Sequence, residues 1–176
     1  MENRIWTIGH STRSIEEFVS LLKGQEITLL VDVRRFPGSR KWPHFNKENL
    51  EKLLKESGID YKHIEALGGR RKADPNSKNI AWRNESFRAY SDYTETETFT
   101  AALDELKGHA LKKNTAIMCS EAVWWRCHRS IISDYLSVQG WKVLHILSDK
   151  KVQLHPYTAA ANIIDGQLSY KGIFGE

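Results

Sequence analysis

The chain has few of the features that mark disulfide-rich or membrane-spanning proteins. Only two of its 176 residues are cysteine. Two cysteines do not make a disulfide framework, which favours a reducing environment in which both thiols stay free. The longest apolar run is far shorter than the roughly 20 residues that cross a bilayer. We therefore expect no membrane-spanning segment and no membrane partner.

The chain also lacks internal repeats, low-complexity tracts and a recognisable targeting segment. Its first residues, MENRIWTIGHS, contain no apolar stretch followed by small residues, so we expect no signal peptide and a cytoplasmic location. A chain of this length buries roughly 70% of its unfolded surface on folding. This is enough to form a full hydrophobic core without disulfide bonds or a structural metal ion. We predict one domain over residues 1–176.

Charge of one sign is concentrated in two short segments, although the net charge of +4 is mild and typical of a solvated basic surface. The segment RRFPGSRK (34–41) holds four cations and no acid, and GGRRK (68–72) holds three more. Each segment contains glycine, which predicts a loop. Two basic loops favour an anionic partner over an apolar one.

Hydrophobic patterning predicts strands that alternate with helices. The strands are predicted at 4–9, 27–34, 59–65, 114–119 and 141–148, and the helices at 15–24, 46–58, 86–93, 96–110 and 122–140. This alternation implies a single three-layer α/β domain, Rossmann-like, with a mainly parallel five-stranded sheet. Residues 67–84 are predicted to be a long basic loop, and residues 149–176 a C-terminal extension that packs on the domain.

Polar residues capable of chemistry follow the predicted strands directly. They are Gly9, His10 and Ser11 after the first strand, Asp32, Arg34 and Arg35 after the second, His63, Gly68, Gly69 and Arg70 after the third, Cys119 and Glu121 after the fourth, and Asp149 and His155 after the fifth. Ligands of open α/β sheets bind outside the carboxyl ends of the strands. We therefore expect these residues to share one cleft.

Five motifs together resemble the prokaryotic domain-of-unknown-function 488 family over nearly the whole chain. They are TIGHSTRSIEEFVSLL, LLVDVRRFPGSR, HIEALGGRR, MCSEAVWWRCHR, and HILSD followed by HP. The resemblance implies that these segments carry the family's own hallmarks, and it implies no activity. The matching positions are Gly9, His10, Ser11, Asp32, Arg34, Pro37, Ser39, Gly68, Gly69, Arg70, Cys119, Glu121, Cys127, His128 and Arg129. One departure is the apolar AVWWR between Glu121 and Cys127, where relatives are polar.

Anion binding is the chemistry that the basic residues favour. A helix start offers free N–H groups, and arginines grip phosphate in a bidentate manner. An alternative is that Arg34 and Arg129 form internal ion pairs with Asp32 and Glu121. The predicted ligand-binding residues are Gly9, Ser11, Arg34, Ser39, Arg40, Gly68, Gly69, Arg70, Cys127 and Arg129.

The candidate catalytic residues are Asp32, Glu121, His128, His10 and Cys119. Two carboxylates at strand ends suit acid–base cleavage of a glycosidic, N-glycosidic or phosphodiester bond, unless they only cap a loop and a helix. Cys119 is an alternative nucleophile, with packing as the competing interpretation. Its spacing to Arg126 is one residue too long for the phosphatase loop, and a sulfur-transfer loop would need arginine where Trp124 stands. Without a CxxC pair, no metal site is predicted.

Aromatic residues near the basic loops suggest stacking on bases, although core packing is the alternative for each. They are Trp42, Phe45, Trp82, Tyr90, Trp124 and Trp125. The first hypothesis is therefore a phosphate-bearing ligand, a nucleotide or nucleic acid, bound in the cleft and acted on by a hydrolase-like enzyme. The second is a non-catalytic nucleic-acid-binding module, and the third a thiol-dependent redox or sulfur-transfer enzyme centred on Cys119. The sequence specifies neither a cofactor nor an oligomeric state.

Overall fold

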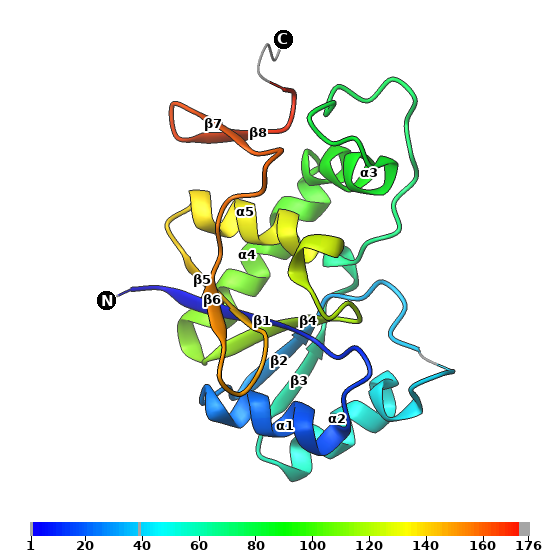
Figure 1. Ribbon diagram of the computed structural model, residues 1–176, viewed down its shortest axis with the longest axis vertical. Coiled ribbons are helices and arrows are strands. Elements are labelled where there is room, and N and C mark those ends of the chain that lie inside the picture. Colours follow the sequence, from blue (N-terminus) through cyan, green and yellow to red (C-terminus); the bar gives the residue numbers. More distant parts are fainter. Residues whose placement is uncertain (1, 39, 173–176) are drawn as a thin grey trace.

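The computed structural model describes residues 2–38 and 40–172 and has an α/β fold in three layers (Figure 1). Its central sheet has six strands in the order β3-β2-β4-β1-β5-β6. The strands are β1 (Arg4–Gly9), β2 (Leu29–Asp32), β3 (Asp60–His63), β4 (Thr115–Cys119), β5 (Lys142–Ile146) and β6 (Val152–Leu154). The first five are parallel, and β6 adds to the β5 edge in the antiparallel direction.

Five α-helices and three 3-10 turns connect the strands. The helices are α1 (Ile15–Gly24), α2 (Lys47–Glu56), α3 (Glu85–Thr94), α4 (Glu97–Lys112) and α5 (Arg129–Val138), and the turns are η1 (Pro43–Phe45), η2 (Glu65–Leu67) and η3 (Trp124–Arg126). Ser14 and Thr96 cap α1 and α4 by accepting hydrogen bonds from backbone N–H groups of the first turn. Among the described residues, none of these helices combines the length and apolarity that a bilayer crossing requires.

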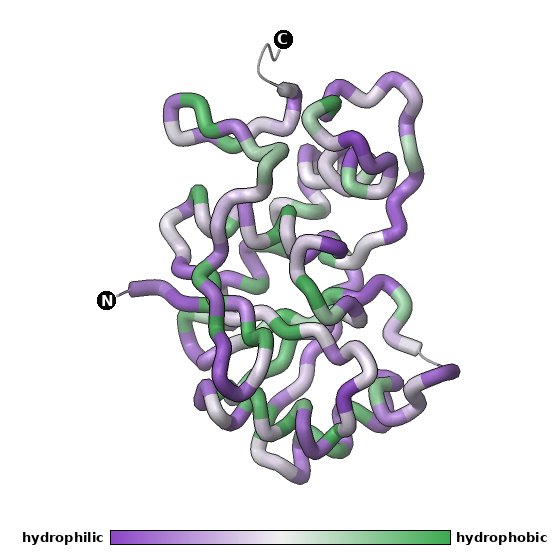
Figure 2. Tube along the Cα trace, viewed as in Figure 1, coloured by the Kyte–Doolittle hydropathy of each residue, from purple (hydrophilic) through white to green (hydrophobic). Residues whose placement is uncertain are grey.

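Two hydrophobic clusters hold the helices against opposite faces of the sheet. One cluster joins Phe18 of α1 and Leu50 of α2 to the sheet, and the other joins Leu103 of α4 and Ile131 of α5 to it. In Figure 1, α1 and α2 accordingly lie below the sheet, while α3, α4 and α5 lie above it. Figure 2 shows the hydrophobic colours along the central strands and hydrophilic colours along much of the loop before α3.

The crossovers place a crevice between β1 and β4, which are adjacent in the sheet. Gly9 at the end of β1 stands opposite Cys119 at the end of β4. The chain leaves β1 for α1 on one face and leaves β4 for α5 on the other face. Adjacent strands whose helices lie on opposite faces open a gap at their carboxyl ends, and this gap is where such folds bind ligands.

The α/β class and the mainly parallel sheet agree with the sequence prediction, and two details differ. The sheet has six strands instead of five, because residues 152–154 pair with β5; a separate hairpin, β7 (Asn162–Ile164) and β8 (Gln167–Ser169), follows. The helix predicted at 122–140 starts only at Arg129. Residues 120–128 form an irregular loop that contains η3, because this segment crosses the end of β1 before the helix begins.

Candidate functional site

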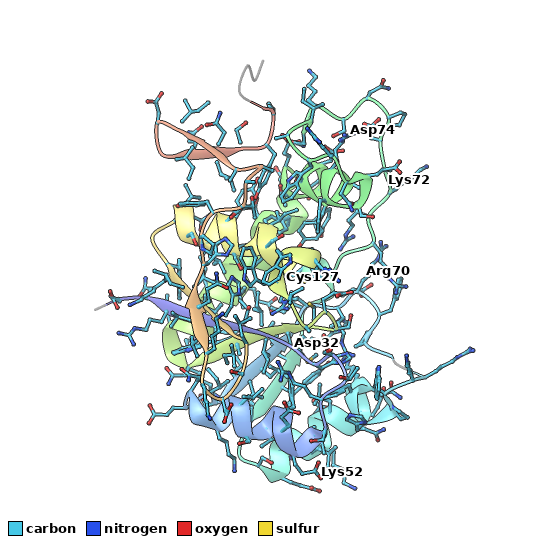
Figure 3. All side chains as sticks on the ribbon, viewed as in Figure 1. Asp32, Lys52, Arg70, Lys72, Asp74 and Cys127 are labelled. Atoms are coloured by element: carbon cyan, nitrogen blue, oxygen red, sulfur yellow. The ribbon has the colours of Figure 1, made fainter. Side chains whose placement is uncertain are left out.

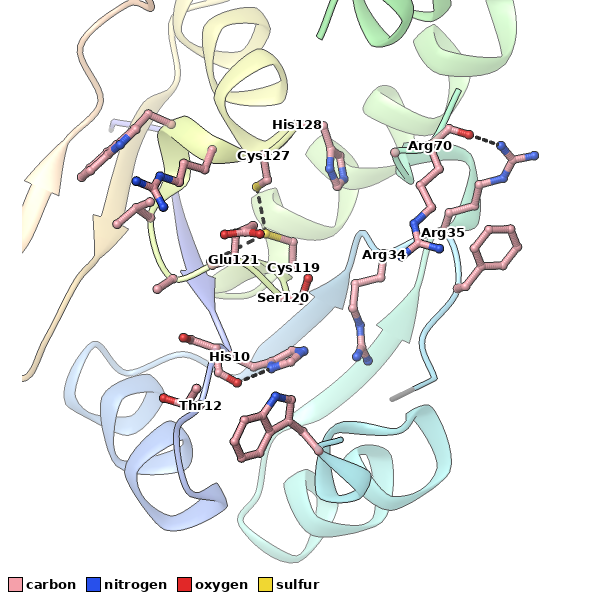
Figure 4. A pocket seen from close by; sticks show the side chains of 18 of the residues that line it. His10, Thr12, Arg34, Arg35, Arg70, Cys119, Ser120, Glu121, Cys127 and His128 are labelled. Atoms are coloured by element: carbon pink, nitrogen blue, oxygen red, sulfur yellow. Dashed lines mark hydrogen bonds between the residues drawn. The ribbon is translucent and has the colours of Figure 1, made fainter. Parts of the chain in front are cut away.

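A pocket of about 760 Å³ opens at the carboxyl ends of β1 and β4 (Figure 4). Four segments line it, namely 10–12 after β1, 34–36 with Gly38 and Trp42 after β2, 69–70 after β3, and 119–123 with 125–128 after β4. The segments are far apart in sequence and meet because the parallel strands end at one edge. The pocket therefore lies in the crevice that the topology creates.

Gly9 allows the loops after β1 and β4 to touch. A Cβ atom at this position would lie 1.7 Å from the carbonyl oxygen of Glu121, so only glycine fits. Beyond it, the His10 N–H donates to the Cys119 oxygen at 3.0 Å and the Ser11 N–H donates to the Ser120 oxygen at 2.9 Å. These bonds extend the strand pairing past β1 and fix the floor of the pocket.

The loop after β4 presents several unpaired backbone donors. The N–H groups of Ser120, Ala122 and Val123 have no hydrogen-bond acceptor among residues 2–38 and 40–172, whereas the Glu121 N–H interacts with the Cys119 sulfur. All four residues line the pocket. Ala122 and Val123 are half-buried, whereas Ser120 is exposed. Because backbone N–H groups withdrawn from water are nearly always paired in folded proteins, the donors of Ala122 and Val123 favour an acceptor supplied from outside the chain.

His10 is a second group in the pocket with unused hydrogen-bonding capacity. Its side chain is 2% exposed and stacks on Phe45 at 4.3 Å between ring centroids. Nδ1 lies 3.0 Å from the Ser11 carbonyl and therefore carries the proton, whereas the buried Nε2 has no partner in the described part of the chain. Burial, with help from the Arg34 charge, lowers the pKa of His10 to about 4. At neutral pH, Nε2 is thus a free acceptor.

His128 has the same arrangement on the opposite wall. Its Nε2 donates to the Val33 carbonyl at 2.8 Å, which leaves Nδ1 as the acceptor. Gly69 packs directly against this ring, and a Cβ at Gly69 would lie 3.1 Å from Nδ1. Burial lowers the pKa of His128, so the ring is neutral near pH 7.

Two residues on the rim hold a backbone conformation that is unusual for their type. Ser11 has φ 46° and Arg70 has φ 56°. Left-handed conformations at residues other than glycine persist only where the surrounding structure enforces them, and they concentrate at binding sites. Ser11 is held by its bond to Ser120, and the carbonyl of Arg70 accepts a hydrogen bond from Arg35 at 2.7 Å.

Asp32 and Arg34 form a buried ion pair at the base of the pocket. One Asp32 oxygen accepts from the Arg34 backbone N–H at 3.0 Å and from Nε at 2.9 Å. The other accepts from Arg34 Nη2 at 2.7 Å and from the Tyr61 hydroxyl at 2.5 Å. The carboxylate thus has four donors and lies below the pocket, whereas the Arg34 side chain reaches its lining. The internal ion pair considered as an alternative from the sequence is present here.

Arg129 makes no such pair with the Glu121 side chain. Its Nη2 donates to the backbone oxygen of Glu121 at 2.7 Å, and its Nε contacts the sulfurs of Cys119 and Cys127. The two sulfurs lie 2.9 Å apart at the base of the pocket, as the dashed line in Figure 4 marks. Figure 3 places Cys127 and Asp32 in the interior and Arg70 toward the side of the molecule.

The pocket rim is cationic and aromatic. Phe36 is 59% exposed and Trp125 is 51% exposed. The guanidinium groups of Arg35 and Arg70 lie 5.5 Å and 5.8 Å from the centre of the Phe36 ring. Arg126 also lines the pocket, where Glu121 is the one acidic residue among the described lining residues. Phe36 was not among the candidate residues predicted from the sequence. Its position after two arginines and before Pro37 in a basic loop could have identified it as a residue of the binding site.

The structure separates the sequence-predicted residues into three groups. Those that line the pocket are His10, Ser11, Arg34, Gly69, Arg70, Cys119, Glu121, Cys127 and His128. Those that support it from below or behind are Gly9, Asp32, Gly68 and Arg129, and exposed Arg40 lies outside the lining. Ser39 lies outside the described residues.

The structure also separates the aromatic candidates. Phe45, Tyr90 and Trp124 are core residues, and half-buried Trp82 packs on Phe87 and Tyr170. Trp42 and Trp125 line the pocket. Within the described ranges, no group of three or more histidine, cysteine or acidic side chains is placed to hold a metal ion.

Comparison with known proteins gives one match. The model of the family described as "Domain of unknown function DUF488" matches residues 14–136, which include β2, β4 and most of the residues that line the pocket. No curated protein and no solved structure matches the chain.

Proposed function

The chain belongs to the DUF488 family, and from this premise we propose that its pocket binds a phosphate-bearing ligand of nucleotide type at the carboxyl ends of β1 and β4. The ligand is either a free nucleotide or a nucleotide within a strand of nucleic acid. Both sources share a phosphate and a flat base, and a free nucleotide or a nucleotide of RNA also carries a sugar hydroxyl.

The observation that carries this proposal is the set of N–H groups at Ser120, Ala122 and Val123, for which the described residues offer no acceptor. Successive backbone donors form a concave site that favours an anion, and phosphate oxygens accept several such bonds at once. Arg70 and Arg126 both line the same pocket and add positive charge to it. Arginine pairs with phosphate through two parallel hydrogen bonds, which fixes orientation as well as charge.

The remaining pocket features fit the rest of a nucleotide. Neutral His10 offers an acceptor at Nε2, which suits a hydroxyl donor such as that of a sugar. Phe36 and Trp125 offer exposed rings at the rim, and bases stack on such rings with about 1–3 kcal/mol per base. A simple inorganic anion would bind the N–H groups but would contact neither His10 Nε2 nor the rings of Phe36 and Trp125.

Proton transfer within the site would fall to Glu121 and His10. The Glu121 side chain is exposed at the pocket, and His10 Nε2 is unprotonated at neutral pH. Asp32 already accepts four hydrogen bonds, so we assign it to positioning Arg34. Hydrolysis of a phosphate ester or an N-glycosidic bond is the reaction class that such residues support.

Calorimetric titration tests the binding proposal. We expect adenosine 5′-monophosphate to bind more tightly than inorganic phosphate, and adenosine alone to bind weakly or not at all. Arg70→Ala and Arg126→Ala each remove a charged donor and should weaken nucleotide binding by about tenfold or more. Arg83→Ala is the matched control, because Arg83 is an exposed arginine outside the pocket lining.

A short single-stranded oligonucleotide distinguishes the two sources of the ligand. If it binds far more tightly than the mononucleotide and the affinity falls steeply with salt, the nucleotide belongs to nucleic acid. If the mononucleotide binds as well as the oligonucleotide, the ligand is free. Equal loss of affinity in Arg83→Ala and Arg126→Ala, or binding of adenosine as strong as that of its phosphate, would contradict the proposal.

A further inference from the structure

The two cysteines of the chain meet at the base of the pocket, although seven residues separate them. Cys119 ends β4 and Cys127 precedes α5, and their sulfurs are 2.9 Å apart. A disulfide bond is about 2.05 Å long, so the sulfurs need to approach by only about 0.9 Å to bond. Both residues line the pocket, with Cys119 2% exposed and Cys127 9% exposed. A small reagent in the pocket meets Cys127 first.

Arg129 supplies the positive charge for this pair. Its side chain is 1% exposed, and its Nε lies 3.0 Å from the Cys119 sulfur and 3.4 Å from the Cys127 sulfur. Its backbone N–H also donates to the Cys127 sulfur at 3.3 Å. Within the described ranges, no carboxylate pairs with Arg129. A buried cation without a carboxylate calls for another anion, and a thiolate at this position is that anion.

We assign the negative charge of the cysteine pair to Cys127. Burial alone would raise the pKa of Cys127, but the hydrogen bond from Cys119 and the charge of Arg129 hold it well below its ordinary value. Burial and the hydrogen bond with Cys127 raise the pKa of Cys119. The geometry agrees, because the Cys127 sulfur accepts from both the backbone N–H and the Nε of Arg129 and is the more exposed of the two, so we assign the thiolate to Cys127 and the thiol to Cys119. This arrangement differs from the sequence hypothesis, which placed the nucleophile at Cys119.

A buried chain of hydrogen bonds holds the Arg129 guanidinium in place. Nη1 donates to Thr7 Oγ1 at 3.0 Å, and Thr7 donates to His145 Nδ1 at 2.5 Å. His145 Nε2 donates to His155 Nδ1 at 2.8 Å, and His155 Nε2 donates to the Asp134 carboxylate at 2.7 Å. The direction of donation is fixed at the two ends, because guanidinium only donates and carboxylate only accepts. The Arg129 guanidinium beside the thiol pair is thus held through β1, β5, the residue that follows β6, and α5.

We propose that Cys127 and Cys119 form a reactive dithiol pair that reduces small disulfides entering the pocket. Cys127 is the attacking thiolate and Cys119 is the resolving thiol. Nothing in this step requires a phosphate on the reagent, so the activity stands apart from nucleotide binding.

The exchange balances in two steps. The Cys127 thiolate attacks one sulfur of a disulfide RSSR, forms a mixed disulfide and releases RS⁻. Cys119 then gives its proton to the released thiolate and attacks the Cys127 sulfur, which forms the Cys119–Cys127 bond and releases the second RS⁻. The protein loses two electrons and one proton, and the external disulfide becomes one RSH and one RS⁻.

The test uses the full reduced chain and 4,4′-dithiodipyridine, a neutral disulfide that releases a coloured thiopyridone. Wild-type protein should release two equivalents and retain no adduct, so that its intact mass falls by two hydrogens. Cys119→Ser should release one equivalent and keep a pyridylthio adduct on Cys127. Cys127→Ser should react far more slowly. Circular dichroism checks that each variant folds, with Cys119→Ala and Cys127→Ala as second variants.

The pH dependence of the wild-type rate keeps the proposal falsifiable even if a variant fails to fold. A thiolate near neutrality reacts at about pH 5.5, where an ordinary thiol with a pKa of about 8.5 is almost fully protonated. A wild-type rate no faster than that of N-acetylcysteine at this pH would overturn the proposal, as would a stable adduct on Cys119. Arg83→Ala, a change outside the pocket lining, should leave the rate unchanged, and because the assay contains no nucleotide its outcome is independent of nucleotide binding.

Discussion

At the scale of single residues, His10 shows how burial turns a common side chain into a specific acceptor. Its ring is fixed by stacking on Phe45, its proton is fixed by the Ser11 carbonyl, and its free Nε2 faces a pocket of arginines. A protonated imidazole would repel those arginines, and burial prevents that protonation near neutral pH. The neutral His10 ring can therefore accept a hydrogen bond from a hydroxyl group of the ligand, whereas the phosphate is bound by the arginines and the backbone N–H groups.

This role gives a prediction for His10→Phe. Phenylalanine keeps an aromatic ring that stacks on Phe45 but lacks Nε2, so the ligand loses one hydrogen bond. We expect nucleotide affinity to fall by about threefold to tenfold, which corresponds to a net hydrogen bond of about 0.5–1.5 kcal/mol. Affinity for inorganic phosphate should stay the same, because phosphate has no sugar hydroxyl. Parallel calorimetric titrations with both ligands measure the difference, and equal loss for both would contradict this role.

Many of the residues that line the pocket were predictable from the sequence, whereas their pairing was not. His10, Arg70 and Glu121 follow predicted strand ends, and this alone placed them at one edge of the sheet, whereas Cys127 was named from the family resemblance. The contact between Cys119 and Cys127 depends on the path of an irregular loop. No periodic pattern encodes such a path, so the thiol pair appears only when the coordinates are known.

At the scale of elements, the loop after β4 depends on its contact with the end of β1. The strand β1 was predicted with its observed ends, because a short apolar run that stops at glycine is a local signal. Residues 122–128 were predicted to be the first part of a helix over 122–140, but the helix begins only at Arg129. The β1 backbone excludes that helix, because residues 119 and 120 already pair with His10 and Ser11. Tertiary contact overrides local preference here.

Gly9→Ala tests this contact. The new Cβ would fall 1.7 Å from the Glu121 oxygen, so one of the two backbones must move. We expect a loss of about 1–3 kcal/mol in the free energy of unfolding, together with weaker nucleotide binding, because the donors at 120–123 are displaced.

Gly108→Ala is the matched control for that experiment. Gly108 lies inside α4, and a Cβ there meets nothing within 4 Å. The same change should therefore stabilise the protein by about 0.5–1 kcal/mol through helix propensity. Urea unfolding of both variants measures the contrast. If Gly9→Ala unfolds at the same urea concentration as wild type, the close approach of β1 and the loop does not constrain the site.

At the scale of the whole molecule, the strand order creates the site. The alternation of strands and helices was enough to predict a parallel sheet, and a parallel sheet gathers the strand-end residues at one edge. The position of the crevice between β1 and β4 depends on the order β3-β2-β4-β1-β5, which local patterns do not specify. The antiparallel strand β6 escaped prediction because it has only three residues.

The same burial that prepares the site makes the fold sensitive to acid. Burial lowers the pKa of His10 to about 4 and that of His145 to about 2, and it also lowers the pKa of His128. In the unfolded chain each ring returns to its ordinary pKa of about 6.5. Below that pH the histidines bind protons in the unfolded state but not in the folded state, so the free energy of unfolding decreases as the pH falls. Above it, both states are neutral at these positions and the effect vanishes.

We therefore expect the free energy of unfolding to decrease between about pH 7.5 and about pH 5.5, by up to about 1.4 kcal/mol per pH unit for each of these histidines once the pH is below 6.5. Unperturbed carboxylates are ionised throughout this range, whereas a Cys127 thiolate adds a slope of the same sign, which Cys127→Ser removes. Urea unfolding at the two pH values measures the change, and the ring-proton NMR signals of the folded protein identify its source. If stability is constant across this range, or if the His10 ring of the folded protein titrates near pH 6.5, then Nε2 is not held as a neutral acceptor. In that case the charge state on which the pocket's selectivity for a hydroxyl-bearing ligand depends would be absent.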